Sequence, residues 1–229
     1  MGLVDDTSMD QVLLFPHLGL GDALICNAIV RHLAAKHALV VVLCKPHNRD
    51  TEDFMWRDVI NLDLCTVRDD DQAKEAAALA RQHGYGVVGL GFWGEQPFDR
   101  QQWDREFYRQ ARVDFQQRWS GFVVSRQPSR EHPIPAGDYC LIHEDKERGY
   151  LIDRSRLPKM PIVEITPKSG NLFDFWGLTE NATELHFMES SPAILADSLP
   201  LLKAKRKAIH CYCRESVPPK YQADWEMLR

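Results

Sequence analysis

A short apolar strand that passes through a glycine turn into an amphipathic helix limits most strongly how this chain can fold. Residues 11–17 (QVLLFPH) are apolar over a length typical of a buried strand. Residues 22–37 carry apolar side chains at helical spacing, and only the segment LGLG separates the two. A strand that leads into a helix rejoins its sheet by a crossover, so this order predicts a parallel sheet.

The same order of strand and helix repeats along the first half of the chain. We expect further strands at 38–46, 62–68 and 85–93, and helices at 48–60 and 69–84. The second of these helices has acidic residues in its first turn and a glycine after its end, as the helix dipole and the capping rules favour. This alternation predicts an α/β unit with right-handed crossovers.

The chain changes character near its middle and then returns to the same pattern. Residues 94–126 are aromatic, polar and predicted to be helical, and residues 125–139 are rich in Pro, Ser and charge, which is typical of a connection between domains. After this connection we expect strands at 139–145, 160–167, 184–191 and 208–213, helices at 171–182 and 191–203, and a helical segment at 218–229 that packs back on the chain.

Two halves of similar size follow from this pattern. We predict an α/β fold with two Rossmann-like halves, residues 1–130 and residues 131–229, whose parallel sheets face a cleft. Ligands of such sheets bind beyond the carboxyl ends of the strands. The residues at those strand ends are therefore the candidates for function.

The composition limits which partners the protein is expected to bind and in which cellular compartment we expect it. With 28 Lys and Arg against 33 Asp and Glu, the net charge of −5 argues against a general nucleic-acid binder. No apolar run approaches the roughly 18–20 residues of a transmembrane helix. The acidic start of the chain is unlike a signal peptide, so we expect a cytoplasmic protein. The six cysteines include no Cys-x-x-Cys pair and are predicted to be reduced core residues.

The turn PHLGLGD at residues 16–22 has two interpretations. Gly19 and Gly21 allow a tight turn and the close approach of another molecule, and Asp22 stands at or next to the start of the helix. Asp is also a preferred N-cap residue, so the turn can serve the helix alone. The spacing differs from the dinucleotide fingerprint, because Leu24 stands where a third glycine is required, and no Walker loop occurs.

Two stretches resemble a known enzyme family. HLGLGDALICNAIVRHL resembles the N-terminal loop and helix of the ADP-heptose:lipopolysaccharide heptosyltransferases, glycosyltransferase family 9. ELHFMESSPAILADSL is similar to their donor-binding turn, with Glu189, Ser190 and Ser191 where the family has Asp-Ser-Gly. The resemblance implies a GT-B fold, with the first domain on the acceptor side and the second binding the nucleotide sugar. It also implies that Asp22 is the catalytic base.

These observations together lead us to expect a metal-independent glycosyltransferase. Transfer of a sugar to the hydroxyl of a glycan or lipopolysaccharide-type acceptor needs a base, and it needs amides or cations around the departing diphosphate. Helix starts after Gly21 and at Ser191 can supply such amides. The acidic triplet at 69–71 has the Asp-x-Asp spacing of metal-dependent transferases, but it stands at the start of a predicted helix. We therefore expect neither a metal nor a cofactor. A lipid-linked acceptor would make the protein peripheral to a membrane.

Other polar residues near the expected strand ends are candidates for contacts with the donor or the acceptor. Arg148 precedes a glycine, and Lys168 and Ser169 lie in the turn TPKSGN. Both segments fit phosphate-binding turns, and plain surface turns fit them as well. His17 and His143 follow predicted strands, where each can face a ligand or serve as a hydrogen-bonded structural residue.

Two alternatives stay open. The aromatic residues of segment 94–126 can stack on a sugar, although helices that pack their apolar side across the domain interface fit them better. A nucleotide- or nucleotide-sugar-binding α/β protein without catalysis is the alternative to the transferase. A Ser-His-Asp hydrolase is not favoured, because the sequence has no Gly-x-Ser-x-Gly elbow.

Overall fold

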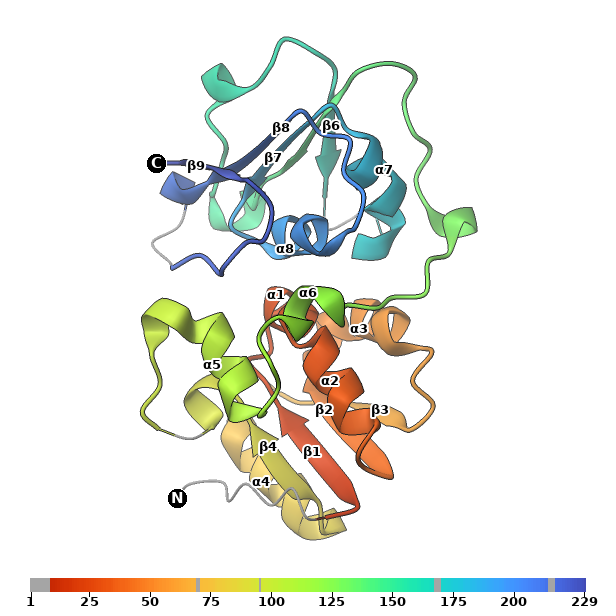
Figure 1. Ribbon diagram of the computed structural model, residues 1–229, viewed down its shortest axis with the longest axis vertical. Coiled ribbons are helices and arrows are strands. Elements are labelled where there is room, and N and C mark those ends of the chain that lie inside the picture. Colours follow the sequence, from red (N-terminus) through yellow and green to blue (C-terminus); the bar gives the residue numbers. More distant parts are fainter. Residues whose placement is uncertain (1–8, 69–70, 95, 167–169, 214–216) are drawn as a thin grey trace. The chain divides into compact units, whose positions relative to one another are not determined.

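The computed structural model describes residues 9–68, 71–94, 96–166, 170–213 and 217–229. The chain divides into two units, Met1–Ser125 and Arg126–Arg229, and each unit has its own parallel sheet (Figure 1). The division lies at 125/126, where the sequence led us to expect 130/131. Both units have the α/β architecture that the alternation of strands and helices predicts.

The first unit is built on four parallel strands in the order β3-β2-β1-β4. The strands are β1 (Gln11–Phe15), β2 (Leu39–Cys44), β3 (Leu62–Thr66) and β4 (Gly86–Gly89). All four lie where the sequence predicts a strand. β4 ends earlier than expected because a 3₁₀ turn begins at Gly91, whose φ is +63°.

The helices of the first unit also follow the sequence pattern, with one interruption. They are α1 (Leu20–Ile25), α2 (Asn27–Ala34), α3 (Arg49–Trp56), α4 (Gln72–His83), α5 (Trp103–Gln110) and α6 (Gln117–Ser120). The helix predicted at 22–37 is broken, since Cys26 between α1 and α2 has φ −79° and ψ 0°. α4 is capped as predicted, by the side chain of Asp71 at its start and by left-handed Gly84 at its end.

Right-handed crossovers decide which face of the first sheet each helix covers. The connection from β3 to β4 runs across the sheet in the opposite direction to the connections before it, which places α4 on the face opposite α2 and α3 (Figure 1). Leu13 and Val41 accordingly share an apolar cluster with Ala76 and Ala80 of α4. Because the strands are parallel, the loops that follow their carboxyl ends all lie at one edge of the sheet.

The aromatic segment packs within the first unit. Tyr108 is buried, donates its hydroxyl to the carbonyl of Ile25 at 2.7 Å, and meets the ring of Phe115 edge-on. Asp104 and Arg118, both buried, form an ion pair between α5 and α6. These contacts favour packing over stacking on a sugar, and they lie within the first unit, whereas we expected packing across the domain interface.

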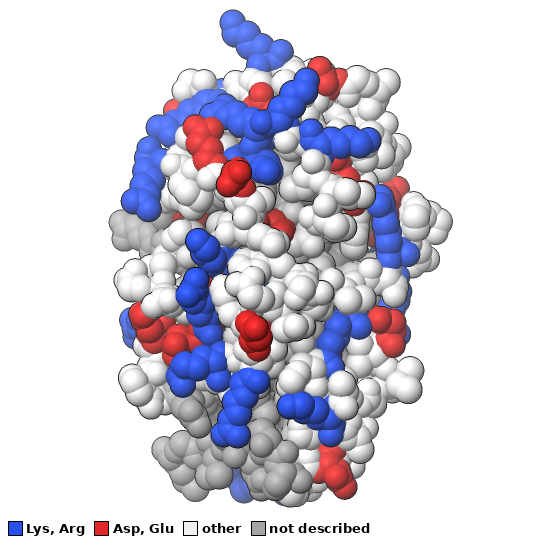
Figure 2. Space-filling view, in the orientation of Figure 1, with Lys and Arg blue, Asp and Glu red and all other residues white. Residues whose placement is uncertain are grey.

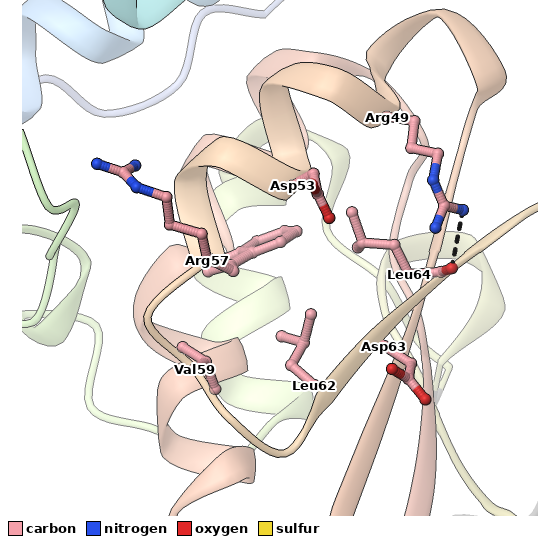
Figure 3. A pocket seen from close by; sticks show the side chains of 8 residues that line it. Arg49, Asp53, Arg57, Val59, Leu62, Asp63 and Leu64 are labelled. Atoms are coloured by element: carbon pink, nitrogen blue, oxygen red, sulfur yellow. Dashed lines mark hydrogen bonds between the residues drawn. The ribbon is translucent and has the colours of Figure 1, made fainter. Parts of the chain in front are cut away.

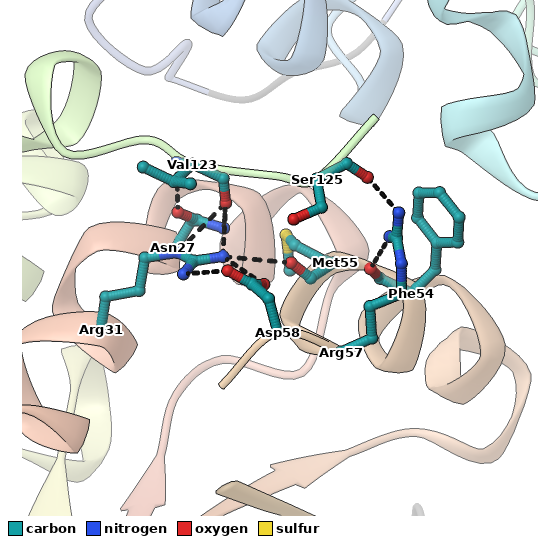
Figure 4. A network of polar contacts seen from close by, with 8 residues as sticks. All are labelled: Asn27, Arg31, Phe54, Met55, Arg57, Asp58, Val123 and Ser125. Atoms are coloured by element: carbon teal, nitrogen blue, oxygen red, sulfur yellow. Dashed lines mark hydrogen bonds and ion pairs between the residues drawn. The ribbon is translucent and has the colours of Figure 1, made fainter. Parts of the chain in front are cut away.

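A network of polar contacts holds the last residues of the first unit on α2 and α3 (Figure 4). The side chain of Asn27 donates to the carbonyl of Val123 at 3.1 Å and accepts its N–H at 3.0 Å. Arg31 donates to the same carbonyl at 2.7 and 3.1 Å. Arg57, after α3, donates to the carbonyl of Ser125. The chain therefore leaves the first unit from a fixed point.

The second unit is built on five parallel strands in the order β6-β5-β7-β8-β9. The strands are β5 (Cys140–His143), β6 (Ile162–Ile165), β7 (Glu184–Met188), β8 (Arg206–His210) and β9 (Glu226–Leu228), and the helices are α7 (Trp176–Asn181) and α8 (Ser191–Ser198). The helix predicted at 218–229 is wrong, because residues 226–228 pair with β8 instead. A short segment gains little from helix formation, whereas the free edge of β8 supplies backbone partners.

The segment that leads into β9 packs back on the unit, as predicted. Asp197 of α8 accepts the backbone N–H of Gln222 at 3.0 and 2.9 Å and that of Ala223 at 3.0 Å. It also accepts the indole N–H of Trp225 at 3.0 Å. One buried carboxylate thus anchors this part of the chain.

The two faces of the second sheet are covered differently. α7 and α8 lie on one face, as right-handed crossovers in this strand order require. The other face is covered by residues 144–161, which contain only short 3₁₀ turns. Ile152 of this segment packs on Cys140 and Ile142 of β5.

All six cysteines are free thiols and four of them are buried, as the sequence predicts for reduced core residues. Burial raises the pKa of Cys44 and that of Cys140 to about 12 each. Both therefore stay protonated at neutral pH.

Candidate functional site

The loop between β1 and α1 lies at the carboxyl edge of the first sheet. Gly19 is the N-cap of α1, and its carbonyl accepts the N–H of Ala23 at 3.0 Å. Gly21 and Asp22 are the second and third residues of the helix, so Asp22 is not the cap and Gly21 is not part of the turn. The Oδ2 atom of Asp22 lies 2.6 Å from where a Cβ of Gly19 would stand. Glycine at position 19 therefore lets this carboxylate lie over the start of the helix.

His17 joins the loops that follow β1 and β4. Its Nε2 atom accepts the N–H of Phe92 at 3.1 Å, so the hydrogen of the neutral ring is on Nδ1. A Cβ on Gly91 would stand 2.1 Å from this Nε2, and the side chain of Gln110 bonds both backbone groups of Gly91 at 2.6 and 3.0 Å. Burial lowers the pKa of His17 to about 4. The ring is thus an uncharged structural contact at neutral pH, and its role toward a substrate stays a prediction.

A buried carboxyl group on α3 was not predicted. Glu52 is 2 % exposed, and burial raises its pKa to about 8. Burial raises the pKa of the Cys26 thiol, and the nearby carboxyl groups of Asp22 and Glu52 raise it as well. The helical spacing of Glu52 with Met55 and Trp56, which are also buried, is the signal in the sequence that could have identified it.

His143 and Ser190 meet at the carboxyl edge of the second sheet. Nδ1 of His143 lies 2.9 Å from Oγ of Ser190, and this hydroxyl donates to the carbonyl of Met188 at 3.0 Å. Because the hydroxyl hydrogen is already used, His143 donates from Nδ1 and its Nε2 is an acceptor. Burial lowers the pKa of His143 to about 4, so the ring is neutral at pH 7. The structure thus brings together two residues that the sequence indicated separately.

The start of α8 offers a limited set of backbone donors. Ser190 is the N-cap, and its carbonyl accepts the N–H of Ala193 at 3.1 Å. Pro192 has no N–H, so the N–H of Ser191 is the group that this helix start can present to an anion. Glu189, directly before the cap, is 6 % exposed.

Of the residues predicted to contact phosphate in the second unit, Arg148 is paired with a carboxylate of the same unit. Arg148 lies in a 3₁₀ turn that ends at Gly149, whose φ is +76°. Its guanidinium pairs with Asp145, and its backbone N–H donates to the same carboxylate at 3.2 Å. Lys168 and Ser169 lie outside the described residues.

A second arginine, which was not predicted, is fixed near the same edge. Glu144 directly follows β5 and is 2 % exposed. It accepts the N–H of Ile152 at 2.7 Å and a guanidinium N–H of Arg154 at 2.6 Å. The side chain of Arg154 is 51 % exposed, so it can reach a ligand from this position.

A pocket of about 470 Å³ lies between α3 and β3 of the first unit (Figure 3). It is lined by Arg49, Asp53, Trp56, Arg57, Val59, Leu62, Asp63 and Leu64. Arg49 donates to the carbonyl of Leu64 at 2.9 Å, which ties α3 to the strand. The pocket contains none of the residues predicted from the sequence.

The described residues contain neither a group of side chains suited to a metal ion nor a helix suited to crossing a membrane. Among these residues, no three or more His, Cys, Asp or Glu side chains are grouped as a metal ion would require. No described helix combines the length and apolar character that crossing a bilayer demands.

Two solved structures of glycosyltransferases share the fold of this chain. A family 9 glycosyltransferase from Veillonella parvula DSM 2008 matches 100 % of this chain and 88 % of its own, with a TM-score of 0.59 and 10 % identity. The iron-containing dodecameric glycosyltransferase TibC from enterotoxigenic E. coli H10407 matches 91 % of this chain, with a TM-score of 0.53 and 15 % identity. The match spans only 59 % of the TibC chain.

The two matches establish the architecture. The GT-B-like α/β fold with two parallel sheets, predicted from the sequence, is confirmed. No protein-family model matches the chain, and no curated protein sequence does. At such low identity the likeness shows the fold alone, because one fold serves many activities.

Proposed function

We propose that this chain is a glycosyltransferase that moves a sugar from a nucleotide-sugar donor to an acceptor hydroxyl. The observation that carries the proposal is the match of the whole chain to a family 9 glycosyltransferase structure. The acceptor in this proposal is a glycan or a lipopolysaccharide-type molecule, and the protein is cytoplasmic. A lipid-linked acceptor would bring it to a membrane surface.

Asp22 is the proposed general base. Its half-buried carboxylate lies at the start of α1, beyond the carboxyl end of the central strand β1. In the reaction it takes the proton of the acceptor hydroxyl while that oxygen attacks the anomeric carbon of the donor. The bond from this carbon to the diphosphate oxygen breaks, and the nucleoside diphosphate leaves with the electron pair.

The carboxyl edge of the second sheet is the proposed donor site. The N–H of Ser191 and the guanidinium of Arg154 can face the diphosphate. The Nε2 atom of neutral His143 accepts hydrogen bonds, so it suits a donor hydroxyl better than a phosphate. Lys and Arg side chains are abundant on the face seen in Figure 2, so the net charge of −5 does not exclude an anionic ligand. We propose that these donors stabilise the leaving group without a metal.

A nucleotide-sugar-binding protein without catalysis is the second candidate. It is favoured by the ion pair of Arg148 with Asp145, which occupies the arginine that we predicted for phosphate. The change from Asp-Ser-Gly to Glu189-Ser190-Ser191 points in the same direction.

A ligand screen on the full chain tests both candidates. Thermal unfolding is measured with ADP, UDP, GDP and CDP and with sugar derivatives of each, because a ligand of the folded state raises the melting temperature. The donors that stabilise the chain are then incubated with glycan acceptors, and release of the nucleoside diphosphate is measured. Acceptor-dependent release supports the transferase, and stabilisation without release supports the binding protein. A panel without any stabilisation contradicts both.

A further inference from the structure

A continuous line of polar side chains lies on the face of the second sheet opposite α7 and α8, the face that residues 144–161 cover. Nε2 of His186 lies 3.0 Å from Oε2 of Glu184, and Nδ1 of the same ring lies 3.1 Å from Nε2 of His210. Nδ1 of His210 lies 2.7 Å from the hydroxyl of Tyr212, which also accepts the N–H of Asp153 at 2.8 Å. Both histidines are fully buried, whereas Tyr212 is 40 % exposed.

With neutral histidines, the hydrogens of this line can be placed in one way. The carboxylate of Glu184 only accepts, so His186 donates from Nε2 and accepts at Nδ1. His210 must then donate from Nε2 and accept at Nδ1, and Tyr212 must donate its hydroxyl hydrogen inward. Every polar atom along the line is satisfied in this arrangement.

We propose that Glu184, His186, His210 and Tyr212 form a proton relay that takes up one proton as a unit. Tyr212 passes its hydrogen to Nδ1 of His210 and takes up a proton from solvent, while His210 passes its Nε2 hydrogen to Nδ1 of His186. The product is an imidazolium at His186 beside the Glu184 carboxylate, a neutral His210 with its hydrogen on Nδ1, and a Tyr212 hydroxyl that points outward. The relay does not depend on the proposed transferase activity.

Charged groups from the neighbouring strands and from the covering segment surround the relay. Nη1 of Arg206, on β8, lies 3.9 Å from Oε2 of Glu184. Nε of the same side chain pairs with Oε2 of Glu226, on β9, at 2.8 Å. The segment covering this face brings Arg156, which lies over the Tyr212 ring, and Asp153. Arg154 and the thiol of Cys140, on β5, are further charged or titratable groups on this side.

The surroundings shift the pKa values of the two histidines in different ways. Burial, together with His186, Arg156 and Arg206, lowers the pKa of His210 to about 4, although Asp153 opposes this shift. Burial also lowers the pKa of His186, but its hydrogen bond to Glu184 opposes this shift. Of the two rings, His186 is the one that is hydrogen-bonded to a carboxylate, that of Glu184, which stabilises its cation.

The relay ends at the edge where the strands of the second sheet present their carboxyl ends. Tyr212 follows β8 there, as His143 ends β5 and Ser190 follows β7. Uptake of the proton converts the Tyr212 hydroxyl from an internal donor into a donor toward solvent or a ligand. Acid would thereby change the hydrogen-bonding character of this edge without a change of fold.

Nuclear magnetic resonance of the ¹⁵N-histidine-labelled full chain tests the relay. Near neutral pH we expect both rings to carry their hydrogen on Nε2. On acidification His186 should gain its second hydrogen as His210 moves its hydrogen to Nδ1, at one shared midpoint. A hydrogen on Nδ1 of His210 at neutral pH, two separate midpoints, or unfolding before any uptake would overturn the proposal. These measurements use the unaltered chain and require no variant.

Two variants test whether the proton-uptake midpoint depends on the direct contact with Glu184 or on any nearby carboxylate. Glu184→Gln keeps an acceptor for His186 but removes the charge, and we expect it to lower the midpoint by about 1 pH unit or more. Glu226→Gln is the matched control, because Glu226 pairs with Arg206 and lies on the neighbouring strand. We expect a clearly smaller shift in the control. Equal shifts would contradict a direct relay through Glu184.

Discussion

Nδ1 of His143 and Oγ of Ser190 are joined by a hydrogen bond of 2.9 Å, although the two residues lie 47 positions apart in the chain. They meet because β5 and β7 are neighbours in the sheet and both are parallel, so the ends of the two strands lie at one edge. The bond also fixes the neutral ring, and His143 is one of several at least partly buried histidines that acid would charge.

We predict that the free energy of unfolding decreases as the pH falls from 6.5 to about 4. Burial lowers the pKa of His17 and that of His143 to about 4 each, against an ordinary value of 6.5. In this window the unfolded chain binds more protons than the folded chain, so the stability present above pH 6.5 is lost on acidification. Below about pH 4 both states are protonated at these sites and the histidine contribution stops changing.

Urea unfolding at pH 7.5, 5.5 and 4.5 measures this dependence. His143→Gln keeps a donor for Ser190 but cannot titrate, so its loss between pH 7.5 and 4.5 should be smaller than that of the unaltered chain by about 2–3 kcal/mol. Identical pH dependence in the two proteins would show that His143 is not held neutral.

A second prediction concerns two glycines with left-handed backbones. Gly91→Ala should destabilise the chain by about 2–4 kcal/mol, because the new Cβ would meet His17 in addition to adopting an unfavourable φ. Gly84→Ala is the matched control, since its φ is +71° but nothing lies within 4 Å of its Cβ position. It should cost only the backbone term of about 1–2 kcal/mol. Equal losses in urea unfolding would contradict the contact with His17.

A third prediction concerns the anchor of residues 217–229. Asp197→Ala leaves the N–H groups of Gln222 and Ala223 and the indole of Trp225 without their acceptor. We expect a loss of about 2–4 kcal/mol in unfolding free energy. Amide hydrogen exchange at residues 222–223 should also become faster. Asp224→Ala, an exposed acidic residue of the same segment, should leave both readouts unchanged.

The sequence predicts the strands of the two sheets well, because a strand covered on both faces must be apolar along its length. β2 shows this plainly, with buried residues from Val40 to Cys44. The interruption at Cys26 and the strand β9 were not predictable, because both depend on what the chain packs against. β9 exists only because the edge of β8 is available to residues 226–228.

The candidate site was predictable to a similar degree. The sequence identifies the loop before α1 and the turn at Ser190, since both follow apolar strands. It does not show that Gly19 caps α1 in place of Asp22, because cap geometry depends on where the first helical hydrogen bond forms. It also does not show that His186 and His210 touch, since these residues are 24 positions apart and only the order of strands joins them.

The last prediction distinguishes the proposed base from a structural acid. Since Gly19 caps α1, Asp22→Asn should retain the fold and cost at most about 0.3–1 kcal/mol of helix-dipole stabilisation. If Asp22 is the base, turnover with a donor and acceptor from the screen should fall by about 10²–10⁴-fold, while donor affinity and melting temperature stay nearly unchanged. Turnover is measured as release of the nucleoside diphosphate at saturating donor.

Glu52→Gln is the control for this experiment, because Glu52 is the other carboxyl group near Cys26. Burial raises the pKa of Glu52 to about 8, so the group is largely protonated at pH 7. The variant should therefore keep most of its turnover at pH 7. Full activity in Asp22→Asn together with loss of activity in a folded Glu52→Gln would transfer the role of base to Glu52. Loss of turnover in Asp22→Asn alone, with the donor still bound, is the outcome that the position of Asp22 at the end of β1 leads us to expect.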